Sequence, residues 1–312
     1  MKIAILYTGE LRTVEKTIEY FKQNILLTSD VHVFAVVQSE YESKYEKFLH
    51  TQMKSHLKSL KWFRKKDTLW IELREYLLIQ IANTVDDNYK NYLRKSGSMI
   101  EYYQLYLAYI QMYEYEKLTG EVYDYVVRMR PDVIITKMLC FDWIDWTVDS
   151  IKMKFSHIKF VNTDEKICWI MNSLIDSSRQ HDIGNYTITI SNDLLLTDLR
   201  KKYTDQKLID YIKNGNYIIT LRKNVLYIVK RKLFSPLSSL GYTYGLHLDE
   251  DPNWISAESQ LIHILLENNI TIFNSNTLCE HACILNYNKD EYFLENGSLR
   301  KRNDVFFFIR RF

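Results

Sequence analysis

The chain has 312 residues, 46% of them hydrophobic and 26% charged, which is the composition of a globular protein and excludes disordered and low-complexity classes. The formal net charge is +2, with 41 basic and 39 acidic residues interspersed, and this balance argues against a nucleic-acid-binding protein. Four cysteines give no disulfide framework, no apolar run reaches the length of a bilayer span, and the apolar start at residues 1–7 is too short for a signal peptide, so we expect a cytoplasmic protein.

The first forty residues predict a β-α-β unit. Residues 2–7 form a nearly continuous apolar run typical of a buried strand, and Val14, Ile18 and Phe21 then recur at helical spacing. A second apolar run covers residues 31–37. Because crossovers of this kind are right-handed and join parallel strands, the unit indicates an α/β fold.

The next hundred residues predict a helical insertion and a long helix. Residues 40–95 are charged, aromatic and helix-like, and we expect them to form the insertion. Residues 98–101 read Ser-Met-Ile-Glu, the pattern of a capping box, and tyrosine and leucine then recur at helical spacing until Gly120, which predicts the helix end. This tyrosine stripe can be a stacking platform for bases or sugars, but core packing explains the spacing better.

An apolar strand pattern at residues 123–135 is interrupted by Arg128-Met129-Arg130-Pro131-Asp132. Beyond it the pattern stays mixed, with strands expected at 158–161, 186–190 and 270–273, and helices at 194–199, 208–212 and 261–266. Residues 305–309, followed by Arg310 and Arg311, are expected to form an apolar strand or an aromatic-basic tail. We expect one domain over residues 1–312, in which 276–312 are a C-terminal extension.

The segment Thr8 to Arg12 is the first candidate for ligand binding. In parallel sheets ligands bind beyond the carboxyl ends of the strands, and this segment follows the first strand. Gly9 permits close approach of a ligand, Thr8 and Glu10 can hydrogen-bond a base or ribose, and Arg12 can add charge to phosphate binding. A tight strand-to-helix turn is the structural alternative. The sequence has neither G-x-G-x-x-G nor the P-loop pattern, which excludes Rossmann dehydrogenases and P-loop hydrolases.

Asp132, with two arginines close in sequence, is the second candidate. Its carboxylate can hold Mg²⁺ or Mn²⁺ against a diphosphate, and Arg128 or Arg130 can neutralise the leaving diphosphate. The structural alternative is an Arg–Asp ion pair that holds the end of a strand.

Five segments together resemble a poorly characterised group of glycosyltransferases with a GT-A-like fold. They are Tyr7-Thr8-Gly9-Glu10-Leu11-Arg12, the tyrosine-rich helix, residues 123–132, Asn192-Asp193, and Ala257-Glu258 at the start of a late helix. The resemblance spans residues 1 to about 275. It implies a central, mostly parallel sheet flanked by helices, with a nucleotide-binding half and an acceptor-binding half. It also implies a UDP- or GDP-sugar donor, a glycan or other hydroxyl acceptor, and Mn²⁺ or Mg²⁺.

The resemblance also assigns residues. Thr8 to Arg12 would contact the nucleotide, and residues 130–132 would stand where GT-A enzymes carry an Asp-x-Asp metal motif, with Arg130 in place of the first aspartate. Asp193 is the implied base or acceptor-orienting carboxylate, with Glu258 as the other candidate. A helix N-cap at 192–193 and a helix-dipole charge at Glu258 are their structural alternatives. His281 is an implied metal partner of Asp132, against the alternative of a structural histidine.

Two further features are open to more than one interpretation. Cys279, His281 and Cys283, with Cys140 or Cys168, lack the spacing of a strong zinc signature. The basic segments 61–66 and 230–232 and the tail 305–312 can contact an anionic membrane or a phosphorylated acceptor, but solvated helix faces and an edge strand explain them equally well.

The functional alternatives are a non-catalytic nucleotide- or glycan-binding protein with the same fold, or a sugar nucleotidyltransferase. The first is motivated by the missing first aspartate. The single glycine of Thr8 to Arg12 disfavours the second, because that chemistry usually uses a glycine-rich basic loop.

Overall fold

The structure is a computed structural model that describes part of the chain. The described residues are 1–27, 30–81, 97–135, 217–222, 226–244, 260, 261, 264, 265, 267, 268, 270–274, 282–285 and 306–309. The elements predicted at 158–161, 186–190, 194–199 and 208–212 lie outside these residues.

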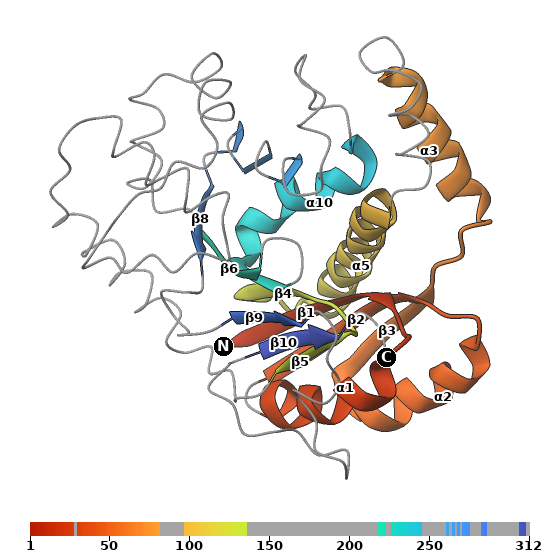
Figure 1. Cartoon of the computed structure of the whole chain (residues 1–312). Coiled ribbons are helices and arrows are strands. Elements are labelled where there is room, and N and C mark those ends of the chain that lie inside the picture. The colour runs from red at the N-terminus through yellow and green to blue at the C-terminus, as the bar shows by residue number, and fades with distance from the viewer. Residues whose placement is uncertain are drawn as a thin grey trace, which may run out of the picture.

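A seven-stranded sheet forms the centre of the molecule (Figure 1). Its strand order is β3-β2-β1-β4-β7-β6-β8, and β7 alone among these strands runs antiparallel to its neighbours. The strands are β1 (Lys2–Glu10), β2 (Asp30–Gln38), β3 (Leu57–Trp62), β4 (Tyr125–Met129), β6 (Tyr217–Arg222), β7 (Leu226–Lys230) and β8 (Thr271–Asn274).

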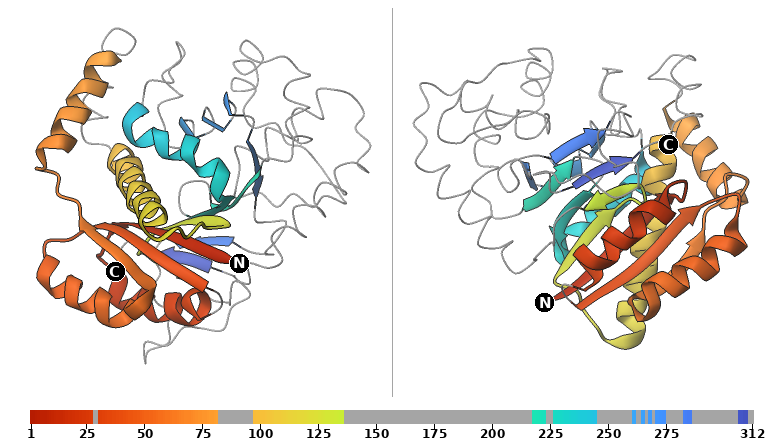
Figure 2. Two further views of the ribbon diagram at one scale, coloured as in Figure 1. Left: turned by 180° about the vertical axis from the view of Figure 1, so that it is seen from behind. Right: turned by 60° about the horizontal axis from the view of Figure 1, so that its bottom comes forward.

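Helices cover both faces of this sheet, as the two views of Figure 2 show. One face packs against α5 and α10, and the other against α1 and α2, so each face has its own hydrophobic core. The helices are α1 (Val14–Phe21), α2 (Glu42–Met53), α3 (Thr68–Gln80), α5 (Gly97–Thr119) and α10 (Phe234–Thr243), with short helical turns η1 (Lys22–Leu26), η2 (Lys54–His56) and η5 (Arg231–Leu233). The predicted α/β class with a mostly parallel sheet is therefore confirmed. In the described ranges, no helix combines the length and the hydropathy of a membrane span.

The β-α-β unit is confirmed, with a longer first strand than predicted. β1 and β2 pair in parallel from Lys2↔Asp30 to Glu10↔Gln38, and α1 buries Val14, Ile18 and Phe21. Alternate β1 side chains point to opposite faces of the sheet, and a hydrophobic core covers each face. Because both sets of side chains are buried, nearly every residue of the strand is apolar. The segment Thr8 to Glu10 is therefore the end of the strand and not a loop.

The range 40–95 contains a strand, which corrects the expectation of a purely helical insertion. β3 lies between α2 and α3 in sequence and pairs in parallel with β2 at the edge of the sheet. Leu57 is buried, whereas Lys61 is exposed. Mixed exposure of this kind fits an edge strand, and it hides the strand from a search for apolar runs.

The long tyrosine-rich helix is confirmed, but its predicted capping box is wrong. α5 already includes Gly97, so Ser98 is not the residue that precedes the helix. The helix ends where Gly120 adopts a positive φ of 72° and donates its N–H to the Glu116 carbonyl at 2.9 Å. Core packing of the tyrosine stripe is confirmed at Tyr102 and Tyr109, which are buried.

A second, three-stranded sheet has the order β5-β10-β9. Its strands are β5 (Val133–Ile135), β9 (Ala282–Leu285) and β10 (Phe306–Ile309). β10 pairs antiparallel with β5 and parallel with β9, so the expected C-terminal extension contributes two strands, of which β10 pairs with the segment that follows β4. The strand predicted at 305–309 is confirmed, as is the one at 270–273, which corresponds to β8.

Candidate functional site

The two segments singled out in the sequence lie side by side at the carboxyl edge of the sheet. β1 pairs in parallel with β4, with Tyr7 opposite Met129, so the ends of both strands face the same edge. A Cβ added to Gly9 would lie 3.1 Å from Cδ of Pro131, and the φ of Gly9 is 138°. A side chain at Gly9 would therefore be strained and crowded, which is the physical reason for glycine here.

Helix α1 also holds this junction. The hydroxyl of Thr17, on α1, donates to the Pro131 carbonyl at 2.5 Å and lies in the core. The turn after β4 is thereby tied both to the first helix and to the end of β1. The backbone around position 131 is positioned by three elements.

Two arginines and two carboxylates form a cluster at this edge, with Arg128 and Asp132 buried and Arg130 and Glu101 partly buried. The Arg130 Nε and Nη2 donate to the two carboxylate oxygens of Asp132 at 2.8 and 2.7 Å, which is a bidentate pair. Arg128 Nη2 donates to Glu101 on α5, and Arg130 Nη1 lies 3.9 Å from the same carboxylate. The side chains of Arg128 and Asp132 are only 2% and 3% exposed, so these charges are held in place by one another inside the protein.

The hydroxyl of Thr8 is buried without a hydrogen-bond partner among the described residues. Thr8 is 1% exposed, and it follows Ala4 and Leu6 on the face of β1 that turns toward α5. Thr13 Oγ1, just before α1, is in the same state. Buried hydroxyls are almost always hydrogen-bonded, so two orphaned ones near one edge mark a place where a polar ligand can supply the missing partner.

Tyr7 lies below this edge, on the other face of β1. Burial raises the pKa of its hydroxyl, and the negative charge of Asp132 raises it further, whereas a hydrogen bond with Thr17 acts in the opposite direction. Tyr7 therefore stays neutral, and its ring, 5.1 Å from that of Phe21, is part of the core. Its hydroxyl is hydrogen-bonded to Thr17 and lies close to the carboxylate of Asp132.

Glu10 and Arg12 are the solvent-facing part of the predicted loop. They form an ion pair at 3.4 Å, with side chains 46% and 40% exposed, respectively. Leu11 between them donates its N–H to the Gln38 carbonyl at 3.0 Å, which anchors the segment to the end of β2. Both side chains are therefore accessible to a ligand at the carboxyl edge.

The described residues do not offer a metal site. No group of three or more histidine, cysteine, aspartate or glutamate side chains suited to a metal occurs among them. Both oxygens of Asp132 accept hydrogen bonds from Arg130, and Glu101 is paired with Arg128. Hard cations need several free oxygen ligands, and this cluster does not provide them.

Several predicted site residues lie outside the described ranges. They are Asp193, Glu258 and His281, together with the cysteines Cys140, Cys168 and Cys279. Thr8, Gly9, Glu10, Arg12, Arg128, Arg130 and Asp132 are brought to one edge of the sheet, as expected.

Glu101 is a member of the cluster that sequence reasoning missed. The sequence pattern assigned Glu101 to a capping box with Ser98, which the structure does not show, and nothing in the sequence links it to Arg128, 27 residues later. A buried strand that contains an arginine requires a carboxylate nearby, and that requirement is the signal that could have prompted a search for a partner.

Comparison with known proteins adds little to this geometry. No protein-family model and no curated protein matches the chain. Among solved structures, core-mannan synthase A from Aspergillus fumigatus, in its Mn/GDP form, is similar at 12% identity and a TM-score of 0.37, over 88% of this chain and 73% of that one. Nothing about the activity of this chain follows from a likeness at that level.

Proposed function

We propose that this protein is a glycosyltransferase that moves a sugar from a UDP- or GDP-sugar to a hydroxyl of a glycan or another acceptor. The observation that carries the proposal is the junction of residues 8–12 with residues 128–132 at the carboxyl edge of a parallel sheet. Ligands of open α/β sheets bind at this edge, and here it carries arginines, a buried orphaned hydroxyl and a glycine at which a side chain would be strained and crowded.

The arginines suit the charge that develops in such a reaction. When the bond between the sugar and the diphosphate breaks, negative charge gathers on the departing diphosphate. A guanidinium held rigidly by a carboxylate is a pre-oriented donor for phosphate oxygens, and Arg130 is held in this way by Asp132. Thr8 and Arg12 would contact the nucleotide, while Asp193 and Glu258 remain the candidates for the base that takes the acceptor proton.

A divalent cation is a separate part of the proposal. Because Asp132 and Glu101 are both paired with arginines, Mn²⁺ or Mg²⁺ would depend on ligands outside the described ranges, such as His281. The arginines can take over part of the neutralising role that a metal would play. Charge stabilisation by the arginines does not require a metal.

A non-catalytic nucleotide- or glycan-binding protein is the second candidate. The bidentate pair of Arg130 with Asp132 favours it, because that pair uses both oxygens of the one carboxylate retained from the metal motif. Such a protein would bind a nucleotide or glycan at the same edge without breaking the sugar–phosphate bond.

A panel of nucleotide-sugars, assayed for release of free sugar and nucleoside diphosphate, separates the two candidates. We expect slow hydrolysis of at least one UDP- or GDP-sugar by the wild-type chain. Arg130→Lys keeps the charge but loses the bidentate geometry, and it should reduce that rate by about tenfold or more. Arg74→Lys, on α3, is the matched control and should leave the rate unchanged.

Nucleotide binding without sugar release from any donor would favour the binding protein. Neither binding nor release would contradict both candidates.

A further inference from the structure

Helix α3 exposes an apolar stripe on the outside of the molecule. It buries Trp70, Leu77 and Leu78 in the core, yet Leu69, Tyr76 and Ile79 are 72%, 52% and 67% exposed. Spacings of seven and three residues put these three side chains on one side of the helix. Figures 1 and 2 both place α3 at the periphery, extending away from the central sheet. Exposed apolar side chains grouped on one side of a helix are a candidate contact surface.

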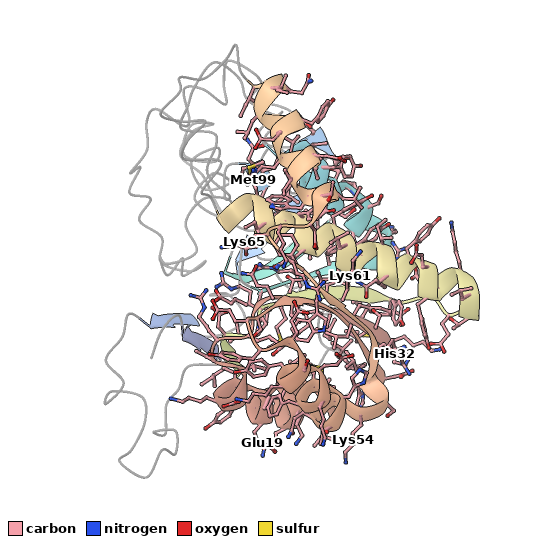
Figure 3. All side chains as sticks on the ribbon, turned by 90° about the vertical axis from the view of Figure 1, so that its right-hand side faces the viewer. Glu19, His32, Lys54, Lys61, Lys65 and Met99 are labelled. Atoms are coloured by element: carbon pink, nitrogen blue, oxygen red, sulfur yellow. The ribbon has the colours of Figure 1, made fainter. Side chains whose placement is uncertain are left out.

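Positive charge is concentrated immediately before this helix. Lys61, Lys65 and Lys66 are exposed, and Arg64 beside them is paired with Glu42 at 2.5 Å. Residues 58–80 contain six basic and three acidic residues, a net charge of +3, whereas the whole chain has only +2. This segment is therefore locally positive. Figure 3 labels Lys61 and Lys65 on the strand and the turn that lead into α3.

We propose that Lys61, Lys65, Lys66, Leu69, Tyr76 and Ile79, the α3 face, dock on the surface of an anionic lipid bilayer. α3 is apolar on its buried side and on its exposed side, and the lysines lie in the segment that leads into it. On an anionic bilayer the exposed apolar side chains would insert between the lipids, with the ammonium groups of the preceding lysines near lipid phosphates. Tyr76 is suited to the interface because its ring is apolar and its hydroxyl is polar. Glu72, on the same side of the helix, opposes binding but is outnumbered by the lysines.

The charge of the α3 face argues against a second copy of the chain as its occupant. In a symmetric dimer the same surface meets itself, so the lysines of one copy would approach those of the other. Like charges brought together at an interface disfavour the contact, whereas an anionic bilayer attracts them.

The α3 face also lies at the edge of the sheet that carries the candidate site. β3 runs parallel to β2 and β1, so its carboxyl end, from which the chain leads into the lysines and α3, shares an edge with the ends of β1 and β4. Docking would bring this edge close to the lipid surface. The inference does not rest on the proposed function, because it uses only the exposure and charge of the α3 face.

Flotation of the full chain with lipid vesicles tests the proposal. Vesicles of phosphatidylcholine with phosphatidylglycerol should bind the protein, vesicles of phosphatidylcholine alone should bind it weakly, and added salt should release it. The double variant Leu69→Ser/Ile79→Ser should reduce the partition coefficient by about tenfold or more, because it removes two apolar insertions. Lys65→Glu/Lys66→Glu should abolish the preference for anionic lipid.

Leu118→Ser is the matched control. Leu118 is 86% exposed at the C-terminal end of α5, outside the α3 face, and should contribute nothing to binding. Circular dichroism verifies that each variant is folded. Equal binding by the wild type and the double serine variant would overturn the proposal, as would no binding to anionic vesicles. Wild-type self-association that the double variant abolishes would also overturn it, in favour of a second copy.

Discussion

The hydroxyls of Thr8 and Thr17 are equally buried, but only one has a partner. Thr17 donates to the Pro131 carbonyl at 2.5 Å, whereas Thr8 Oγ1 has no partner among the described residues. Both threonines are 1% exposed. Thr17 therefore has a structural role, whereas the hydroxyl of Thr8 is unsatisfied among the described residues.

Valine at each position tests this distinction. Thr17→Val should lower the free energy of unfolding by about 1 kcal/mol, because it leaves the Pro131 carbonyl without its donor. Thr8→Val should instead raise it by about 1 kcal/mol, because an unsatisfied buried hydroxyl is removed, and should weaken nucleotide binding. Urea unfolding and a nucleotide titration measure the two effects. A loss of stability in Thr8→Val similar to that of Thr17→Val would contradict the interpretation.

Glu101 is expected to be essential to the stability of the arginine cluster. Glu101→Gln removes the charge that faces the buried Arg128, and loss of one partner of a buried pair costs about 3 kcal/mol or more. Glu42→Gln is the matched control: its partner Arg64 is 51% exposed, so we expect a loss below about 1 kcal/mol. Chemical denaturation of both variants gives the comparison. Equal losses of unfolding free energy in the two variants would show that the ion pair of Glu101 with Arg128 contributes no more to stability than an exposed pair.

At the scale of elements, Gly241 sets the distance between α5 and α10. A Cβ at this position would lie 2.2 Å from the Cβ of Tyr106 and 2.8 Å from the Tyr102 carbonyl oxygen. Gly241→Ala should therefore destabilise the protein by about 1–3 kcal/mol, because the two helices must move apart. Gly97→Ala, where an added Cβ has nothing within 4 Å, should change stability little. Thermal unfolding of the two variants is the measurement, and equal midpoints would contradict the close helix contact.

The opposite edge of the sheet contains a histidine whose titration should affect stability. His32 on β2 shares a 2.8 Å hydrogen bond with the Tyr123 hydroxyl, and burial, followed by the charge of Lys58, lowers its pKa. The charges of Glu121 and Asp30 act in the opposite direction. Because the folded state binds the proton less well than the unfolded state, stability should fall as the pH drops through about 6.5 toward the lowered pKa.

The predicted loss of unfolding free energy occurs between about pH 7 and about pH 5. It should be smaller in His32→Gln, because glutamine does not titrate but still offers a polar partner to Tyr123. Denaturant midpoints across this range measure it, with His50→Gln on α2 as the control. The prediction fails if His32→Gln and the wild type lose the same stability.

The strands that form continuous apolar runs could be predicted from the sequence, and the edge strand could not. β1 and β2 are buried on both faces, so nearly every residue is apolar and the pattern is unambiguous. β3 carries lysines because it has an exposed edge, and local periodicity then resembles that of a charged helix. Its assignment depends on pairing with β2, which is information that the local sequence does not contain.

At the scale of the whole molecule, the junction of residues 8–12 with 128–132 could be predicted because topology alone requires it. Two parallel strands that are neighbours in a sheet bring their following segments to one edge, whatever the intervening chain does. The pairing of Arg128 with Glu101 could not be predicted in this way, because it depends on how α5 packs across the sheet. The sequence motifs thus indicated which two segments meet at this edge, whereas packing determined which charges balance one another.

The two edges of the central sheet carry different features. The candidate site and the α3 face both belong to the carboxyl edge of the sheet, whereas His32, Tyr123 and Glu121 surround its amino edge. If both proposals hold, the protein works at a lipid surface with its nucleotide site turned toward it.

Isothermal titration calorimetry with UDP and with GDP, in the presence and absence of Mn²⁺, tests the central claim most directly. The wild-type chain should show saturable binding of at least one nucleotide. Arg12→Gln, a change at an exposed side chain that the fold tolerates, should weaken binding by about tenfold. No binding of either nucleotide by the wild type, or equal affinity in Arg12→Gln, would contradict the account of this edge as a nucleotide site.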